Sequence, residues 1–159
     1  MKMMFFSKHL GDLPLAEAGQ VIRELGFEGV DLTVRPGGHV LPENARSELL
    51  DAVRTCADLG LQVPLITTAI TSAHEPFAVD VFEMAAEAGI PNLKLGYWQY
   101  EALGTLRGRI DDIALNLDGI EELACRTGVR AVIHNHSGNY VSALAPVVWT
   151  LIADRDPAA

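Results

Sequence analysis

Cysteine is scarce in this sequence, with only Cys56 and Cys125 among 159 residues. The two lie far apart in segments with helical patterns, so they form neither a disulfide framework nor a metal-binding motif. We expect both to pack as small apolar side chains. No apolar run approaches the roughly 20 residues that span a bilayer, and the opening residues are too short for a signal peptide. We therefore expect a cytoplasmic protein with no membrane partner.

Basic residues are also few: 12 lysines and arginines stand against 21 aspartates and glutamates, for a net charge of −9. This balance argues against nucleic-acid binding, because proteins that bind the phosphate backbone usually carry a basic face. No Gly-x-Gly-x-x-Gly fingerprint or P-loop follows a predicted strand, so the usual nucleotide sites have no support. With 49% hydrophobic residues the chain can bury a core, and we treat residues 1–159 as a single domain.

One pattern of strand, polar loop, helix and glycine recurs five times along the chain. The predicted strands occupy residues 3–6, 30–34, 63–67, 93–97 and a stretch that begins at residue 129. Apolar residues at helical spacing mark the helices between them, and a last helix is predicted at roughly residues 141–153. Strands that alternate with helices predict right-handed βαβ units and a parallel sheet.

Two α/β architectures fit this pattern. An open, doubly wound sheet of five strands would be complete at this length. A (β/α)8 TIM barrel needs eight units and about 250 residues, so the chain would be the first five units of a partial barrel with outer helices. A partial barrel leaves its first and fifth strands as open edges, and we would then expect marginal stability and self-association.

Residues 129–139 begin as a β-branched apolar strand and end in a group of polar side chains. Side chains alternate along a strand, so His134 and His136 point one way and Asn135 the other if the strand persists. The two imidazoles either belong to a functional site or are loop histidines bonded to backbone or water. This stretch alone does not separate the two interpretations.

All five histidines follow a predicted strand and precede a predicted helix. They are His9, His39, His74, His134 and His136. In a parallel α/β fold such loops converge on the C-terminal edge of the sheet, where active sites form. Loops are polar in any protein, but five histidines of five at one edge favour a site there. The residues expected at this edge also include Arg35, Thr68, Tyr97, Gln99, Tyr100 and Asn135.

Two charged residues interrupt predicted strands. Lys94 lies in an otherwise apolar strand, where it either faces the barrel axis as a site residue or points outward past a helix. Asp31 also has apolar neighbours and could be an ion partner of Lys94. The loop residue Arg35 could bind a carboxylate or phosphate through two guanidinium nitrogens, or tie two loops together.

Four stretches carry a resemblance to a known family. They are Ser-Lys-His-Leu at residues 7–10, Gly-Phe-Glu-Gly-Val-Asp-Leu at 26–32, Arg-Pro-Gly-Gly-His at 35–39 and Asn-His at 135–136. Together they resemble the xylose isomerase-like TIM barrels, the sugar phosphate isomerase/epimerase group, whose relatives include AP endonuclease family 2. The resemblance runs from residue 5 to residue 157, and strands six to eight have no counterpart. We therefore expect the N-terminal portion of such a barrel.

The resemblance also implies site residues and a cofactor. It implies a divalent metal, Mn2+, Mg2+, Co2+ or Zn2+, with His134 as a metal ligand or catalytic group where many members have a glutamate. Imidazole suits Zn2+ or Mn2+ better than Mg2+. His136 is the second implied catalytic residue. The implied substrate-binding residues are His9, Arg35, His39, Tyr97 and Asn135.

The resemblance finally implies a reaction. We predict an isomerase or epimerase that acts on a sugar or sugar phosphate, in which a metal polarises a carbonyl and a base moves the adjacent proton. A keto-sugar lyase uses the same first step and stays open. A non-catalytic sugar-binding remnant, inactive because the chain is truncated, also stays open. The net charge disfavours an AP endonuclease-like nuclease.

Overall fold

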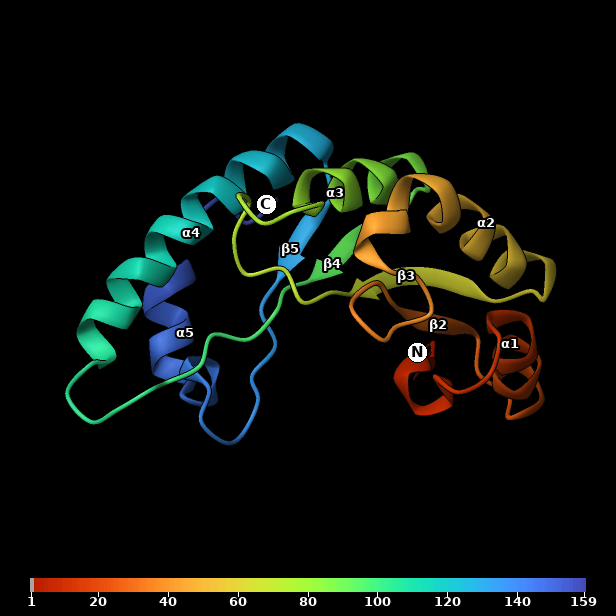
Figure 1. Cartoon of the computed structure of the whole chain (residues 1–159), viewed down its shortest axis with the longest axis horizontal. Coiled ribbons are helices and arrows are strands. Elements are labelled where there is room, and N and C mark those ends of the chain that lie inside the picture. Colours follow the sequence, from red (N-terminus) through yellow and green to blue (C-terminus); the bar gives the residue numbers. More distant parts are fainter. Residues whose placement is uncertain (1) are drawn as a thin grey trace.

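The computed structural model describes residues 2–159, which contain one parallel sheet in the order β1-β2-β3-β4-β5 (Figure 1). Its strands are β1 (Met4–Phe6), β2 (Gly29–Thr33), β3 (Gln62–Thr67), β4 (Asn92–Lys94) and β5 (Arg130–Val132). A doubly wound sheet reverses its strand order at a switch point. Here every strand pairs with the next one along the chain, as in a (β/α)8 barrel. The partial-barrel prediction is confirmed, and the doubly wound alternative is wrong.

The helices follow one another in an arc along the outer face of the curved sheet (Figure 1). They are α1 (Leu15–Glu24), α2 (Ala45–Asp58), α3 (Ala78–Glu87), α4 (Leu106–Thr127) and α5 (Ala145–Ile152). Short 3-10 helices precede or connect them: η1 (Ser7–Leu10), η2 (Pro42–Asn44) and η3 (Val141–Ala143). Among the described residues no helix is long and apolar enough to cross a membrane.

Three boundaries differ clearly from the sequence-based predictions. The strand predicted at residues 93–97 ends at Lys94, so Tyr97 lies in the following loop. The last helix, predicted at roughly residues 141–153, is split into η3 and α5 because Leu144 has an extended backbone between them. The strand that begins near residue 129 ends at Val132, where its pairing with β4 ends at Lys94. His134 and His136 therefore lie in a loop rather than on the strand.

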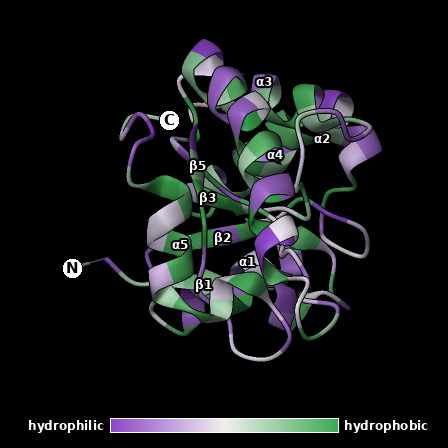
Figure 2. Cartoon of the chain, turned by 90° about the vertical axis from the view of Figure 1, so that its left-hand side faces the viewer, coloured by the Kyte–Doolittle hydropathy of each residue, from purple (hydrophilic) through white to green (hydrophobic). Residues whose placement is uncertain are grey.

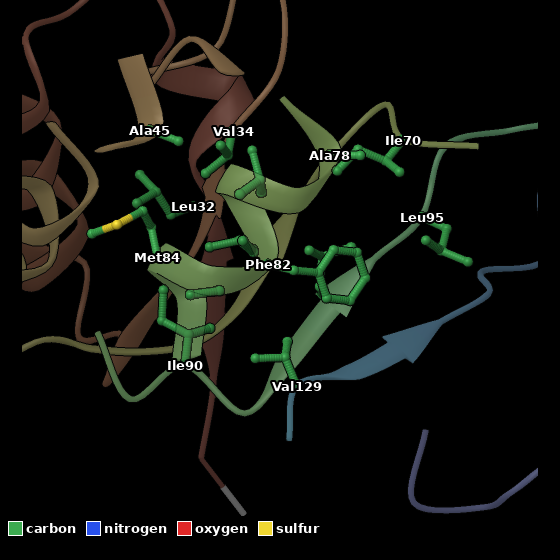
Figure 3. Close-up of a cluster of buried hydrophobic side chains, with 14 of the residues drawn as sticks. Leu32, Val34, Ala45, Ile70, Ala78, Phe82, Met84, Ile90, Leu95 and Val129 are labelled. Carbon is green, nitrogen blue, oxygen red and sulfur yellow. The ribbon is translucent and has the colours of Figure 1, made fainter. Parts of the chain in front are cut away.

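The core lies between the sheet and the helices. Alternate strand residues, such as Val30, Leu32 and Leu93, are fully buried and belong to one cluster with helix residues such as Phe82 (Figure 3). The helix ribbons alternate between hydrophilic and hydrophobic residues, as expected of helices with one buried face (Figure 2). The other alternate strand residues, which include Asp31, face away from the helices and line the inner face of the sheet.

The two cysteines have different surroundings. Cys56 is fully buried in α2, as predicted, and burial raises the pKa of its thiol to about 11. Cys125 is exposed on α4, so the prediction that it packs as an apolar residue is wrong. The adjacent Ala124 belongs to the buried face of α4, whereas Cys125 lies on its exposed face. The Cys125 thiol is 3.9 Å from the Asp156 carboxylate.

Gly96, two residues after the end of β4, is needed for the close approach of two loops. Its backbone N–H donates to the Ile70 carbonyl at 2.6 Å, and a Cβ at residue 96 would overlap the Ala69 carbonyl oxygen. We expect Gly96→Ala to lower the free energy of unfolding by about 1–3 kcal/mol. Gly108→Ala in α4, where a Cβ meets open space, should raise it by up to about 1 kcal/mol. Urea unfolding measures both, and an undiminished stability of the first variant would contradict the close approach.

The sheet has two edge strands, β1 and β5. Within residues 2–159 no strand pairs with the outer edge of β1. At the outer edge of β5, the backbone N–H of Ala131 donates to the Ala159 carbonyl at 2.6 Å. Unpaired edges are templates for association, so we expect the 159-residue chain to self-associate as its concentration rises. Sedimentation velocity tests this. A monomer at every concentration, with a sharp unfolding transition, would contradict the expectation.

Candidate functional site

The residues singled out in the sequence lie at one end of the sheet. They are His9, Arg35, His39, Tyr97, His134, Asn135 and His136, and each follows the C-terminal end of a strand. Because the strands are parallel and adjacent, their C-terminal ends meet at one edge. His74, which follows β3, lies at the same edge, exposed to solvent.

Tyr97 is the centre of an aromatic group formed by the loops after β4 and β5. Its hydroxyl is 3.0 Å from Nδ1 of His134, and its ring centroid lies 4.9 Å from that of His136 and 4.8 Å from that of Tyr140. The backbone N–H of Tyr100 donates to the Asn139 carbonyl at 2.7 Å and holds the two loops together. We call the four rings of Tyr97, His134, His136 and Tyr140 the aromatic group below.

The hydrogen bonds of the two histidines restrict their protons. The Nδ1 atom of His136 lies 2.7 Å from the Ser137 carbonyl, which only accepts. Nδ1 of His136 therefore donates, and Nε2 of the neutral ring is a proton acceptor. His134 can donate its Nδ1 proton to the Tyr97 oxygen or accept from the Tyr97 hydroxyl. In the first case its Nε2 is also a base.

Lys94 lies beneath the aromatic group. Its side chain is 6% exposed, and Nζ sits 3.4 Å from the centroid of the Tyr97 ring. Burial, and then the nearby charge of Arg35, lower the pKa of Lys94 to about 8, while Asp31 acts in the opposite direction. Among residues 2–159 no carboxylate oxygen lies within 4.0 Å of Nζ, so the predicted ion pair with Asp31 is not a direct contact.

Asp31 is linked to Lys94 through the strand between them. The Thr67 hydroxyl lies 2.8 Å from one Asp31 carboxylate oxygen, and the Thr67 backbone is in register with Lys94. Burial raises the pKa of Asp31 to about 6, against the opposing effects of the Thr67 hydrogen bond and the charges of Lys94 and Arg35. A carboxyl and an amine, each with a pKa moved toward neutrality, therefore share the inner face of the sheet.

Three of the predicted residues make local contacts outside the aromatic group. His39 Nδ1 is 3.3 Å from the Thr33 hydroxyl, and the ring of His9 packs edge-on against Phe6, with centroids 5.7 Å apart. The Asn135 amide donates to the Ser142 carbonyl at 2.8 Å. The substrate-binding roles of these three residues stay predictions.

Tyr140, Lys94, Thr67 and Asp31 are absent from the sequence-based choice of site residues. Lys94 and Asp31 each left a signal, as a charge inside an apolar strand. Tyr140 left none, because its contacts depend on how the loop after β5 folds back onto Tyr97. Arg35, which was chosen, contributes charge to both Asp31 and Lys94 and stacks 5.9 Å from the Phe6 ring.

A cavity of about 500 Å3 lies elsewhere, between β5, α4 and α5. Its lining is mostly apolar and includes Leu117, Ile120, Ile133, Trp149 and Ile152. None of the four rings of the aromatic group, nor Lys94 or Asp31, lines it. We therefore place the candidate site at the aromatic group and not in this cavity.

Known structures give this geometry a context, although no family model matches the chain. A D-tagatose 3-epimerase-like protein aligns with a TM-score of 0.70 at 16% identity, covering 98% of this chain and 61% of that one. The E. coli 3-keto-D-glucoside 4-epimerase gives 0.68 at 14% identity, covering 95% and 64%. A xylose isomerase-like TIM barrel protein from Mycobacterium smegmatis, in complex with magnesium, gives 0.64 at 14% identity, covering 96% and 60%.

The chain has the xylose isomerase-like barrel fold. At this level of identity the likeness shows the fold alone, and it confirms the fold that the sequence resemblance implied. The chain spans about 60 to 64% of the length of these three proteins. A PqqA peptide cyclase of Methylobacterium nodulans is 28% identical over 153 residues, which are 93% of this chain but 38% of the cyclase. That match covers too little of the cyclase to support an argument about activity.

The residues of this partial xylose isomerase-like barrel do not by themselves fit a divalent metal. Within residues 2–159 no three side chains of histidine, cysteine, aspartate or glutamate are grouped to hold an ion. Tyr97 engages Nδ1 of His134 and leaves its Nε2 free, but the neighbouring rings of the described chain supply only one further imidazole, that of His136. His134 as a metal ligand therefore stays a prediction that requires ligands from outside this set.

Asp31 should make stability depend on pH. A carboxyl whose pKa rises from 3.8 to about 6 on folding stabilises the folded state when protonated, and this contribution is lost as the pH rises from 4 to 6. An asparagine side chain does not titrate, so the Asp31→Asn variant should not lose this stability as the pH rises. We expect its free energy of unfolding, relative to that of the natural chain, to be higher at pH 7 than at pH 4 by about 1–2 kcal/mol, after discounting for partial exposure. Urea unfolding at both pH values measures the gain, and a constant difference would contradict it.

Proposed function

We propose that this chain belongs to a sugar-modifying enzyme, an isomerase or epimerase that moves a proton next to a carbonyl of a sugar or sugar phosphate. The observation that carries the proposal is that an imidazole, His134, and an amine, Lys94, both contact Tyr97 at the C-terminal edge of the sheet. This edge is where enzymes of the barrel fold have their active sites. Two of the structures with this fold have epimerase in their names, which supports the reaction class.

The proposed roles follow from the chemistry of each group. His134, with its Nδ1 proton donated to Tyr97, takes the proton from the carbon next to the carbonyl through Nε2. The amine of Lys94, next to the Tyr97 ring, is the group placed to activate the carbonyl. His136, whose Nε2 is a proton acceptor, is the second candidate for proton transfer. Arg35 is placed to bind a phosphate or hydroxyl of the substrate.

The cofactor and partners follow the same proposal. A divalent metal would polarise the carbonyl in the complete site, and the magnesium complex of one structure with this fold supports this expectation. The described residues lack a full ligand set, and the proposed roles belong to side chains of this chain alone. The proposed partner is a small sugar, with neither nucleic acid nor membrane, and we retain the cytoplasm as the proposed compartment.

Solvent-deuterium exchange tests the proposal. The protein is incubated in D2O with ketohexoses and their phosphates, with and without added Mg2+ or Mn2+, and NMR follows the proton next to the carbonyl. We expect enzyme-dependent incorporation of deuterium, with formation of the isomer or epimer. Incorporation that ends in loss of water would indicate the lyase instead. Binding of the sugars without any exchange would overturn the proposal and favour a non-catalytic sugar-binding protein.

A further inference from the structure

The amine of Lys94 has no polar partner in the part of the chain that the structure describes. The residue is 6% exposed, Nζ itself keeps a small contact with solvent, and no hydrogen bond or ion pair within residues 2–159 involves Nζ. A buried lysine is normally paired, because an uncompensated ammonium is costly to bury. The Tyr97 ring, 3.4 Å from Nζ, compensates for only part of this cost.

The charged groups around Lys94 add to the cost of the ammonium form. Burial disfavours the ammonium form most strongly, the positive charge of Arg35 also disfavours it, and the Asp31 carboxylate favours it. With its pKa lowered to about 8, Lys94 has a neutral fraction of about 10% at pH 7, whereas an ordinary lysine has less than about 0.1%. Neutral amine is the form that attacks carbonyl carbon.

Lys94 also lies at the end of its strand, next to the candidate site. It is the last residue of β4, and its side chain reaches Tyr97 on the inner face of the sheet, at the edge where the candidate site is located. Thr67, its neighbour in register on β3, connects it to the Asp31 carboxyl. Lys94 therefore shares the Tyr97 side chain with the proposed base, His134, and is linked through Thr67 to a proton donor, Asp31.

We propose that Lys94 Nζ is a nucleophile that forms a Schiff base with the carbonyl carbon of the keto-sugar. This inference rests on the proposed function and names the group that activates the carbonyl. The Nζ lone pair forms the C–N bond, and a proton moves from nitrogen to the carbonyl oxygen to give a carbinolamine. Asp31, protonated, then gives its proton to the hydroxyl, which leaves as water, and a protonated C=N bond remains.

The step balances without any oxidant or reductant. One molecule of water leaves, hydrolysis returns it at the end, and Asp31 recovers its proton from solvent. The protonated C=N bond then withdraws electrons from the adjacent C–H bond, so that His134 can remove this proton more easily. The amine thus supplies the electron sink for the proton transfer.

Borohydride trapping tests the Schiff base directly. The chain has three lysines, Lys2, Lys8 and Lys94, so peptide mapping separates them. The full chain is incubated at pH 7 with dihydroxyacetone, a small ketone sugar, reduced with sodium borohydride and analysed by mass spectrometry. We expect at least about tenfold more reduced adduct on Lys94 than on the exposed Lys8, despite the burial of Lys94. An adduct on Lys8 and Lys2 that equals or exceeds that on Lys94 would overturn the proposal.

Variants and an unfolded control sharpen the result. Lys94→Arg should remove the main adduct, Lys8→Arg should leave it unchanged, and Asp31→Asn should slow its formation. In urea the preference for Lys94 should vanish, because it depends on the fold. Deuterium exchange without an adduct on Lys94 would overturn this inference and leave the proposed function intact. An adduct on Lys94 without deuterium exchange would support the Schiff base and overturn the proposed isomerase or epimerase function.

Discussion

His134→Ala should lower the rate of deuterium exchange at the substrate carbon by about 10²- to 10⁴-fold, the usual contribution of a general base. His134 is exposed, and its side-chain contacts are with Tyr97 and His136, so the fold should survive the change. His74→Ala is the matched control, since His74 lies at the same edge of the sheet, outside the aromatic group, and should leave the rate unchanged. Equal rates for the natural chain and the His134 variant would remove His134 from the mechanism.

The same variant separates two roles of His134. If the imidazole is a metal ligand in the complete site, metal affinity and turnover should fall together. If it is the base, turnover should fall while metal affinity is retained. Isothermal titration with Mn2+ or Zn2+, run beside the exchange assay, distinguishes the two. We expect the second result because no group of metal-ligating side chains surrounds His134 within residues 2–159.

Phe82→Ala should lower the free energy of unfolding by about 3–5 kcal/mol, because the large side chain is fully buried and leaves a cavity. Phe82 lies on α3 in the cluster that joins the helices to the sheet (Figure 3). A loss of this size is a large share of the about 5–15 kcal/mol that stabilise an ordinary domain. Urea unfolding followed by circular dichroism measures it.

The matched control for Phe82 is Leu115→Ala. Leu115 is on α4 and 72% exposed, so its truncation should change the free energy of unfolding by no more than about 0.5 kcal/mol. Losses of similar size in the two variants would mean that the sheet and helices do not enclose the core around Phe82. An unfolded Phe82 variant beside a folded Leu115 variant would agree with the account.

The fold could be predicted because its signals are local and repeated. Apolar runs followed by polar loops gave the parallel strands, and each loop residue was thereby assigned to the C-terminal edge of the sheet. The choice between a barrel and a doubly wound sheet could not be made from these signals, because it depends on the order of strands in space. The sequence resemblance favoured the barrel, and the pairing of each strand with the next confirmed it.

The site was predictable only in part. His134 and Tyr97 were found as polar loop residues, but their direct contact depends on the fold of two loops that are separated by α4. Lys94 and Asp31 were recognised as unusual charges, yet the indirect link through Thr67 requires the register of three strands. Asn135 was chosen for its place in a motif, whereas the backbone turn after β5 directs its amide to the Ser142 carbonyl.

The central claim is that the inner face of the sheet around Tyr97 and Lys94 binds a keto-sugar. NMR of the histidine rings and lysine side chains during titration with D-fructose tests it most directly, since the chain has five histidines and three lysines. We predict shifts of the His134, His136 and Lys94 signals, with the His74 and Lys8 signals unchanged. Shifts confined to the apolar cavity beside Trp149, or saturable binding that leaves Lys94 and His134 undisturbed, would contradict the claim.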